Sequence, residues 1–427
     1  MMIKSFIYEN FKSFEKAELN LEAVTSLVGT NASGKSNAIE GISILAELAM
    51  GVEISVVLDG TRNHDSHVRG GSKACSRFRT SAFRLGCLVD LDDEYDLLYD
   101  IKINTLRRNV VEEESLYKVK NGKTVHQGDK IFRTKLQQEE SGDIKVEYRN
   151  GKRGTNPDIV CIRTVSILSQ MKSKLPENTE IDTENLQYVN LVLENLRGIF
   201  VLHPIPSEMR DYVRITDVEL KTNCENISPV LYNLCQEKEK KKRLLDIVCS
   251  LPENEVKDIE FVVTKLGDVI FGLKEQYLSS SELVDAKKLS DGTLRCIALV
   301  SSMLTMPENG VLVIEEIDNG IHPGRVRKLI ESLQMLGRER NIDIILTTHN
   351  AFLLNSYDKN KLLGVSVVYR DKEKGTSRFI PFVDVKQSPK ILASGGLGYA
   401  MAEETLTDSI KSTDTSIDYS WIVSNDV

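Results

Sequence analysis

The stretch VTSLVGTNASGKS (residues 24–36) is the most informative part of this chain. Its first five residues form a short apolar run that ends at Gly29, and this run predicts a buried strand. From Lys35 onward the apolar residues adopt helical spacing, at Ile39, Ile42, Leu45 and Ala49. A strand, a glycine-rich loop and a helix therefore follow one another.

The loop between that strand and that helix fits the pattern G-x-x-x-x-G-K-[ST] at residues 29–36. In this pattern the glycines let successive backbone N–H groups face a phosphate group, and the helix N-terminus adds positive potential. Lys35 is expected to reach the β- and γ-phosphates of ATP, and the Ser36 hydroxyl is expected to bind Mg²⁺. The residues predicted to contact the nucleotide are Asn31, Ala32, Ser33, Gly34, Lys35, Ser36 and Asn37.

Three further stretches carry side chains suited to this chemistry. The apolar run at residues 311–314 ends in Glu315 and Glu316, which we assign to the magnesium ion and to the attacking water, respectively. A second apolar run ends at Thr348 and is followed by His349, which would face the γ-phosphate at the carboxyl edge of a parallel sheet. Ser290, in LSDGT (residues 289–293), could cap a helix whose N–H groups receive an anion. Each feature alone is common in structural roles.

The order of these motifs resembles the ABC ATPase series of Walker A, signature, Walker B and switch histidine. The element at residues 10–14 (NFKSF) resembles the SMC/RecF-like branch of that family. The LSDGT form and the E-E…N-G-x-H-P stretch at residues 315–323 resemble the stand-alone OLD-like ATPases of bacterial antiphage systems, of the AriA, PtuA and RloA type. The resemblance covers residues 1–166 and 287–381.

The resemblance implies that two heads sandwich two ATP molecules. Ser290, Asp291 and Gly292 of one protomer would then approach the γ-phosphate bound by Lys35 of the other. Asp318 and Asn319 would lie along the interface, Lys12 would approach the nucleotide, and His349 would act in catalysis beside Glu316. Asp291 and Thr293 stand where transporter-type relatives carry glycine and glutamine, which argues against a transporter. No glutamine can be assigned to the Q-loop.

The fold class expected is α/β, an ABC-type P-loop ATPase head with an antiparallel β subdomain and a helical insertion. Residues 1–165 would form the first part of the head, including hairpins around residues 90–96 and at the Asn-Gly pairs 121–122 and 150–151. Residues 166–286 would form a mainly helical insertion with a short hairpin at 259–273. Residues 287–385 would complete the head, and residues 386–427 would form a polar tail.

Composition narrows the class of protein. The chain has 427 residues and a net charge of −8, so any contact with nucleic acid needs a local basic patch. The candidates are residues 107–108 and 238–243, and glutamates interleave the second. The seven cysteines lack metal-ligand spacing, which predicts reduced thiols. The chain shows neither a signal-peptide pattern nor a long apolar stretch, which predicts a cytoplasmic location without membrane contact.

Two patterns could indicate a nuclease. Asp90 and Asp92 spell D-x-D, but they fall in a hairpin turn, where solvation is the simpler role. Arg62 and His67 match the R-x4-H spacing of HEPN ribonucleases, but in a polar loop. The sequence therefore predicts a homodimeric or larger sensor or scaffold ATPase that controls a separate toxin or nuclease and responds to a phage-derived trigger. A RecF-like DNA-repair clamp and a self-contained nuclease remain as alternatives.

Overall fold

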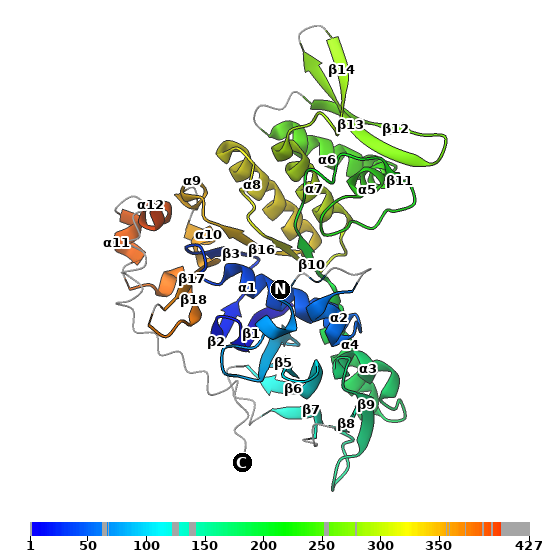
Figure 1. Cartoon of the computed structure of the whole chain (residues 1–427), viewed down its shortest axis with the longest axis vertical. Helices are drawn as coiled ribbons and strands as arrows, with labels where there is room; N and C mark the ends of the chain where they lie inside the picture. The colour runs from blue at the N-terminus through cyan, green and yellow to red at the C-terminus, as the bar shows by residue number, and fades with distance from the viewer. Residues whose placement is uncertain are drawn as a thin grey trace.

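A six-stranded sheet forms the centre of the molecule in the computed structural model (Figure 1). The structure describes residues 2–61, 66, 68–121, 128–135, 142–251, 256–277, 280–355, 357, 359–371, 373–386, 388–393 and 396–402. The first five strands of the sheet run parallel and the last is antiparallel to its neighbour. Their order is β10 (Ile199–Leu202), β15 (Val311–Ile314), β16 (Asp343–Thr348), β3 (Val24–Val28), β17 (Val365–Arg370) and β18 (Ser377–Pro381).

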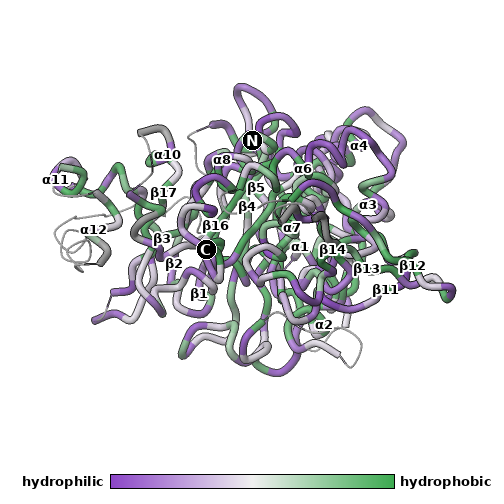
Figure 2. The backbone as a smooth tube through the Cα atoms, turned by 90° about the horizontal axis from the view of Figure 1, so that it is seen from above, coloured by the Kyte–Doolittle hydropathy of each residue, from purple (hydrophilic) through white to green (hydrophobic). Residues whose placement is uncertain are grey.

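Helices cover both faces of this sheet because successive strand residues point to opposite sides. Val311 and Val313 of β15 pack into the cluster that contains α1 (Lys35–Ala49), whereas Leu312 and Ile314 pack into the cluster that contains the helices of the other face. Those helices are α7 (Asp291–Thr305) and α8 (Pro323–Arg340). Figure 2 shows hydrophobic stretches in the central strands and hydrophilic stretches mostly at the periphery.

An eight-stranded antiparallel sheet packs on the other side of α1. Its order is β2 (Phe14–Asn20), β1 (Ile3–Phe11), β4 (Ala82–Asp90), β5 (Tyr95–Asn104), β6 (Val110–Lys120), β7 (Asp129–Thr134), β8 (Asp143–Tyr148) and β9 (Asp158–Ile162). The hydroxyl of Tyr8 donates to the carbonyl of Ala38 in α1 over 3.1 Å. A Cβ at Gly41 would lie 2.6 Å from the Tyr8 ring, so glycine permits this close approach. The helix α2 (Ile54–Asp59) and the short helix η1 (Ser72–Ala74) follow α1 in the chain, and buried residues of α2 join the same apolar cluster.

The predicted hairpins are confirmed, but one of their connections is longer than the sequence suggests. The Asn-Gly pairs predict tight two-residue turns, which need positive φ angles. Between β8 and β9, pairing ends at Glu147 and Asp158, so the pair at residues 150–151 lies in a longer loop. The turn between β6 and β7, with Gly122, lies outside the described residues.

The segment 166–286 contains the predicted helices and also strands that the sequence did not predict. The helices are α3 (Ile167–Lys174), α4 (Glu180–Arg197), α5 (Ile227–Leu234) and α6 (Lys238–Ser250). Thr179 and Asp182 form a capping box that starts α4. Strand β10, however, joins the central sheet beside β15, because its apolar residues are covered on both sides. The segment is thus not a helical insertion throughout, and its boundaries at 165 and 286 stay predictions.

A small antiparallel sheet completes that segment in the upper half of Figure 1. It contains β11 (Val213–Arg214), β12 (Val256–Val263), β13 (Asp268–Tyr277) and β14 (Ser280–Asp285). The hairpin predicted at residues 259–273 is confirmed, with Phe261 opposite Phe271. Residues of this sheet, α5 and α6 share one apolar cluster with α7 and α8.

The sequence predicts a polar tail from residue 386 and assigns no secondary structure to it, whereas the structure contains helices in its first part. The structure forms α11 (Ser388–Ala393) and α12 (Leu397–Ala402), after the short helices α9 (Ala351–Asn355), α10 (Lys359–Leu363) and η3 (Phe382–Asp384). Ile391, Leu397 and Ala400 are buried against Val365 and Phe382, so a few apolar residues suffice to order this stretch. Residues 403–427 lie outside the described residues.

All seven cysteines are free and five are buried, which confirms the prediction of reduced, mostly buried thiols. Among the helices of the described ranges, none combines the length and the apolar character that a membrane crossing needs.

Candidate nucleotide site

The glycine-rich loop runs from the end of β3 to the start of α1, as predicted. Ala32 (φ 61°) and Gly34 (φ 119°) adopt positive φ angles, which curl the backbone between strand and helix. A Cβ at Gly34 would lie 2.7 Å from the hydroxyl oxygen of Ser377 and a Cβ at Gly29 would lie 2.3 Å from the carbonyl oxygen of Val368. The loop therefore needs glycine at both positions, because the hairpin of β17 and β18 packs directly against it.

Three serines hold this loop in place. The buried hydroxyl of Ser377 donates to the carbonyl of Ser33 over 2.6 Å. The backbone N–H of Ser377 donates to the carbonyl of Ser13 over 2.7 Å. The Asn37 amide donates to the Ser13 hydroxyl over 2.8 Å. The sequence motif gives Asn37, and Ser13 falls in the NFKSF element, but no local pattern identifies Ser377.

Lys35 folds over the loop that it follows. Its ammonium group donates to the carbonyls of Gly29 (2.6 Å) and Thr30 (3.0 Å). Burial lowers the pKa of Lys35, while the negative charges of Glu316 and Glu315 oppose that shift. The ammonium group is therefore held at the mouth of the loop and is influenced by both acids at the end of β15.

Glu315 meets the start of α1 as predicted. The Ser36 hydroxyl donates to the Glu315 carboxylate, and the Arg69 guanidinium lies 3.3 Å from the same oxygen. Ser36 and Glu315 are 279 positions apart in the chain, and they meet because β15, β16 and β3 are consecutive parallel strands. A hydroxyl and a carboxylate are hard oxygen donors, so the donor set fits Mg²⁺.

Glu316 follows in a strained backbone conformation. Its φ is 51°, and its N–H donates to the hydroxyl of the buried Thr347 over 2.8 Å. Its exposed carboxylate accepts a hydrogen bond of 3.3 Å from the amide of Asn319. A left-handed conformation at a non-glycine residue costs about 1–2 kcal/mol and persists only where the surroundings enforce it. The Thr347 contact, which the sequence did not predict, enforces it here.

His349 lies where its place in the sequence suggests, one residue after β16. Its side chain is exposed at the carboxyl edge of the sheet. The neighbouring Thr348 hydroxyl accepts the N–H of Asn350 over 3.0 Å and so fixes the turn after the strand. The contact of His349 with a nucleotide stays a prediction.

Lys12 forms an ion pair in this structure. Its ammonium group pairs with the carboxylate of Glu40 and donates to the carbonyl of Arg69 over 3.0 Å. Arg69 also contacts Glu40, at 3.1 Å, and thereby links Lys12 to Glu315. The approach of Lys12 to the nucleotide stays a prediction. Glu40 and Arg69 carry no sequence signal that could have identified them.

The LSDGT stretch begins α7, as predicted. The Ser290 hydroxyl accepts the N–H of Thr293 over 3.1 Å and caps the helix. Asp291 is exposed and pairs with Arg210 at 2.7 Å, whereas Gly292 is buried where a Cβ would lie 2.7 Å from the carbonyl oxygen of Gly320. The start of α7 therefore packs against the turn that follows Glu316. Its contact with a second protomer stays a prediction.

The residues that could have indicated other activities have structural partners or fall outside the structure. Asp90 pairs with Lys4 at 2.6 Å, and the Asp92 carboxylate accepts the N–H groups of Glu94 and Tyr95. Arg62 and His67 lie outside the described residues. In the basic run of α6, Lys240, Lys241 and Arg243 pair with Glu237, Asp258 and Glu339, which is typical of a solvated helix face.

Comparisons with known proteins agree with this geometry. The profile of the family described as "AAA domain, putative AbiEii toxin, Type IV TA system" matches residues 24–355. The energy-coupling factor transporter ATP-binding protein EcfA2 of a Bacillus cereus strain is 31% identical over 132 residues, or 26% of this chain and 44% of that protein. EcfA2 of Enterococcus faecalis is 34% identical over 85 residues, or 20% of this chain and 27% of that protein. The chain thus spans less than half the length of these curated relatives.

The fold also matches a solved structure. The SMC head bound to the C-winged helix domain of ScpA aligns with a TM-score of 0.50 at 13% identity, over 89% of this chain and 98% of that chain. At this identity the likeness shows the fold, which confirms an ABC-type P-loop ATPase head with an antiparallel sheet of eight strands. Since the family profile matches more than half of its length, the chain belongs to the family described as "AAA domain, putative AbiEii toxin, Type IV TA system", with the ABC/SMC type of ATPase head.

Proposed function

We propose that this protein hydrolyses ATP, dimerises when ATP binds, and acts in the cytoplasm as the sensor or scaffold subunit of an antiphage system. The observation that carries the ATPase part is the convergence of Lys35, Ser36 and Glu315 at one edge of the central sheet. No local contact explains it, because strands from opposite halves of the chain build it. Such an edge is where ligands bind in parallel α/β sheets.

The residues divide the work of hydrolysis. The loop N–H groups and Lys35 bind the phosphates, and they neutralise charge that builds up as the terminal phosphoryl group leaves. Ser36 and Glu315 would hold Mg²⁺, which neutralises phosphate charge when bound. The exposed Glu316 carboxylate accepts a proton from the attacking water. Asn319 donates a hydrogen bond to that carboxylate, and the Thr347 hydroxyl holds the backbone N–H of Glu316. His349 is proposed to contact the γ-phosphate from the next strand.

Dimerisation is supported by the surface around Ser290. Ser290 and Asp291 are exposed at the N-terminus of α7, which is 15 residues long and presents N–H groups to an anion. In the proposed dimer this helix start faces the γ-phosphate on the partner protomer. Light scattering of the Glu316→Gln protein should show a dimer with ATP and a monomer without it. A mass that does not depend on ATP would contradict the proposal.

The control of a separate effector is supported by the family. Its description names a toxin of a type IV toxin–antitoxin system, and so connects this chain to systems of paired proteins. The SMC head in the matching structure was solved with a domain of another protein, ScpA. We infer by analogy that this head also engages a separate protein, a toxin or a nuclease.

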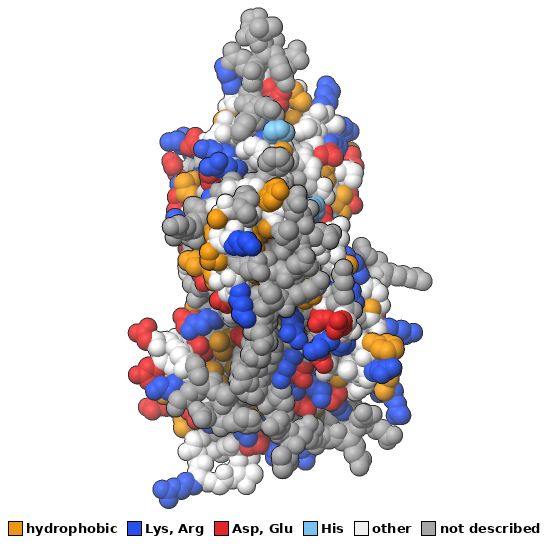
Figure 3. Space-filling model, turned by 90° about the vertical axis from the view of Figure 1, so that its left-hand side faces the viewer, with side chains coloured by type: hydrophobic (Ala, Val, Ile, Leu, Met, Phe, Trp, Pro, Cys, Tyr) orange, Lys and Arg blue, Asp and Glu red, His pale blue; other side chains and the backbone are white. Residues whose placement is uncertain are grey.

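The decisive test is a pull-down of tagged Glu316→Gln protein from its native host before and after phage infection. A stoichiometric protein that is bound beforehand and lost afterwards would support the sensor role. Recovery of DNA alone would favour a RecF-like clamp. On the face seen in Figure 3, basic and acidic side chains are interspersed, which does not favour a broad polyanion-binding surface there.

The word toxin in the family description favours one second candidate, in which this chain is itself the toxic component. Expression of the chain alone in a heterologous bacterium distinguishes the two. Growth arrest that requires Lys35 and no second gene would replace the sensor proposal. Normal growth, with arrest only after the effector gene is added, would support it.

A further inference from the structure

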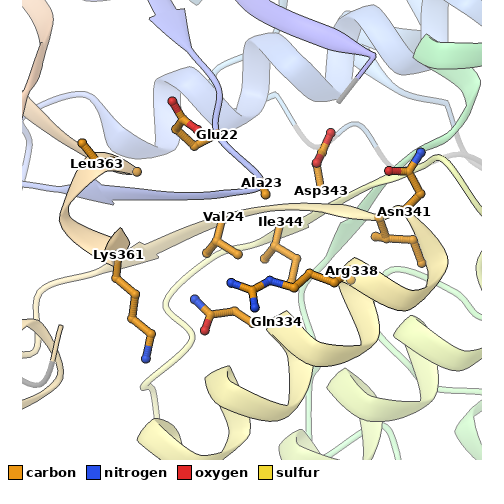
Figure 4. A pocket seen from close by; sticks show the side chains of 13 residues that line it. Glu22, Ala23, Val24, Gln334, Arg338, Asn341, Asp343, Ile344, Lys361 and Leu363 are labelled. Atoms are coloured by element: carbon orange, nitrogen blue, oxygen red, sulfur yellow. The ribbon is translucent and has the colours of Figure 1, made fainter. Parts of the chain in front are cut away.

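The central sheet has a second edge, opposite the nucleotide site. Strands β3 and β16 begin at Val24 and Asp343, and a hollow of about 580 Å³ lies between these strand starts and the C-terminal turn of α8 (Figure 4). A second hollow of about 300 Å³ shares Glu22, Leu363 and Gly364 with the first. The two hollows therefore adjoin each other, and we call them together the edge groove.

Carboxylates dominate the edge groove. Four acids line it, and the cations Arg338 and Lys361 are fewer. The acids are Glu18, Glu22, Asp343 and Asp384. In Figure 4 the carboxylates of Glu22 and Asp343 lie on one side of the strands, while Arg338 lies on the other. These two carboxylates therefore do not face Arg338.

Asp343 is the most constrained of these acids. The residue is only 8% exposed, and no described residue donates a hydrogen bond to its carboxylate or forms an ion pair with it. Burial raises the pKa of Asp343 to about 6. Its carboxylate oxygens keep some contact with solvent at the groove, so a cation that enters the groove could pair with a carboxylate whose hydration burial has already reduced.

Apolar surface lies between the acids. Leu363 is 57% exposed and lines both hollows, and Val383 is 47% exposed and lines the smaller one. Glu18 adds a carboxylate that burial keeps at a raised pKa, with the Ser5 hydroxyl as its donor at 2.6 Å. The groove thus alternates negative charge with exposed apolar side chains.

We propose that the edge groove binds an extended segment of a partner protein that carries lysine or arginine beside apolar residues. In an extended chain successive residues lie about 3.3 Å apart and their side chains point to alternate sides. This arrangement suits a groove with separated acidic and apolar positions. A polyanion such as nucleic acid is disfavoured by the four carboxylates. Identifying this partner with the effector rests on the proposed function, whereas the binding chemistry does not.

The groove is connected to the nucleotide site through two strands. At the groove, the Ile344 N–H of β16 donates to the Ala23 carbonyl over 3.0 Å, and the Ser26 N–H of β3 donates to the Gly364 carbonyl over 2.7 Å. The same strands lead to Gly29 and to Thr347, which orients Glu316. A segment bound in the groove therefore contacts strands that lead to the phosphate loop and to Glu316.

The test is fluorescence anisotropy with the full chain and a labelled seven-residue peptide of alternating lysine and leucine. We expect salt-dependent binding that Asp343→Asn and Glu22→Gln each weaken by about tenfold, since each removes one charge-assisted contact. The exposed Glu22 keeps the test valid if Asp343→Asn does not fold. Asp93→Asn removes an equal charge from an exposed turn of the other sheet and should leave the affinity unchanged.

Several outcomes would overturn the proposal. It would be overturned if a glutamate–leucine peptide bound as tightly as the lysine–leucine peptide. It would also be overturned if Asp93→Asn weakened binding as much as the groove variants, or if both groove variants kept full affinity. Dissociation of a dimer by the groove variants without loss of peptide binding would make the groove a contact between copies of this chain instead. ATP turnover is measured on the same samples: peptide binding without any turnover in the unaltered chain refutes the ATPase proposal and leaves the groove standing.

Discussion

The two large sheets of this protein differ in how the order of their strands relates to the order of the sequence. In the eight-stranded sheet, β4 to β9 follow one another in the order in which they occur in the chain, and neighbours are joined by short connections. In the six-stranded sheet the neighbours β10, β15, β16, β3 and β17 come from three distant regions of the sequence, at residues 24–28, 199–202 and 311–370. Parallel neighbours require such long crossovers, whereas antiparallel neighbours do not.

This difference explains where the chemistry lies. Hairpins bring together residues that are already close in the chain, as in the ion pairs of Arg84 with Asp100 and Glu113. The parallel sheet aligns the carboxyl ends of distant strands and so brings Ser36 to Glu315 and Thr347 to Glu316. Substitutions at its carboxyl edge should change turnover and spare stability. Substitutions inside the antiparallel sheet should do the reverse.

Lys35→Ala is expected to have the largest effect. It removes a charged donor worth about 1.5–3 kcal/mol and the charge that balances the phosphates, so ATP binding and turnover should both be lost. Binding is measured with a fluorescent ATP analogue and stability by urea unfolding. Lys145→Ala makes the same chemical change on an exposed position of β8 and should bind ATP normally. Full ATP affinity of the Lys35→Ala protein would refute the assignment of the loop.

Glu316→Gln comes next. Loss of the proton acceptor should lower the turnover number by about 10²–10⁴, while ATP affinity stays within a few-fold and the dimer accumulates. Phosphate release and analogue binding are measured on the same protein. Glu15→Gln, an exposed position of β2, is the matched control and should keep full turnover. Undiminished turnover in Glu316→Gln would mean that another group activates the water.

Glu114 tests the antiparallel sheet. It is fully buried and accepts the N–H groups of Ile167 and Leu168 and the hydroxyls of Ser166 and Tyr99. Burial raises the pKa of Glu114 from 4.5 to about 7, and those donors oppose the shift. The folded state therefore binds the proton more tightly than the unfolded state, so stability is full below pH 4.5 and declines as the pH rises towards 7.

At about 1.4 kcal/mol per pKa unit, this decline amounts to about 3 kcal/mol. Glu114→Gln should lower stability below about pH 4.5, because Ile167 loses an acceptor, and should flatten the decline at higher pH. Urea unfolding at a series of pH values between about 4.5 and 8 measures both effects, with ATP turnover of the folded protein expected to be unchanged. If the stability of the Glu114→Gln protein declined with pH as steeply as that of the unaltered chain, Glu114 would not be the cause of the decline.

Ser377→Ala is expected to have the smallest effect and probes the support of the phosphate loop within the parallel sheet. It removes the hydroxyl that donates to the Ser33 carbonyl at 2.6 Å, a hydrogen bond worth about 1 kcal/mol. The looser phosphate loop should weaken ATP binding by about five-fold with little change in turnover at saturation. Ser377→Thr, which keeps the hydroxyl, should restore affinity in part. Equal KM values for Ser377→Ala and the unaltered chain would show that Ser377 only packs.

Much of the site could be predicted because its motifs are local. The spacing of Gly29, Gly34 and Lys35 requires a strand before and a helix after the loop, and the structure provides both. Ser290 caps a helix with its own third neighbour, which is also a local property. The fold class followed from the order of these motifs, because each one belongs to a strand end or a helix start.

Other features depend on contacts between distant residues, and no local pattern encodes them. Strand β10 has only four residues, too few for a reliable periodicity, and it is a strand because β15 offers a free edge. Arg69, Glu40 and Ser377 reach the site from positions that carry no motif. Helices α11 and α12 form because their apolar residues meet a cluster built by β17 and η3.

Local sequence was enough to specify the phosphate loop, the capped start of α7 and the acids at the end of β15, since backbone conformation and hydrogen bonding within a few residues define them. Three-dimensional packing was needed to establish which of these elements meet, how Thr347 holds Glu316 in its strained conformation, and that a groove lined by carboxylates lies at the opposite edge of the sheet. The physical reason is that packing and strand pairing act between residues hundreds of positions apart, and their energy depends on the assembled neighbours rather than on the local sequence.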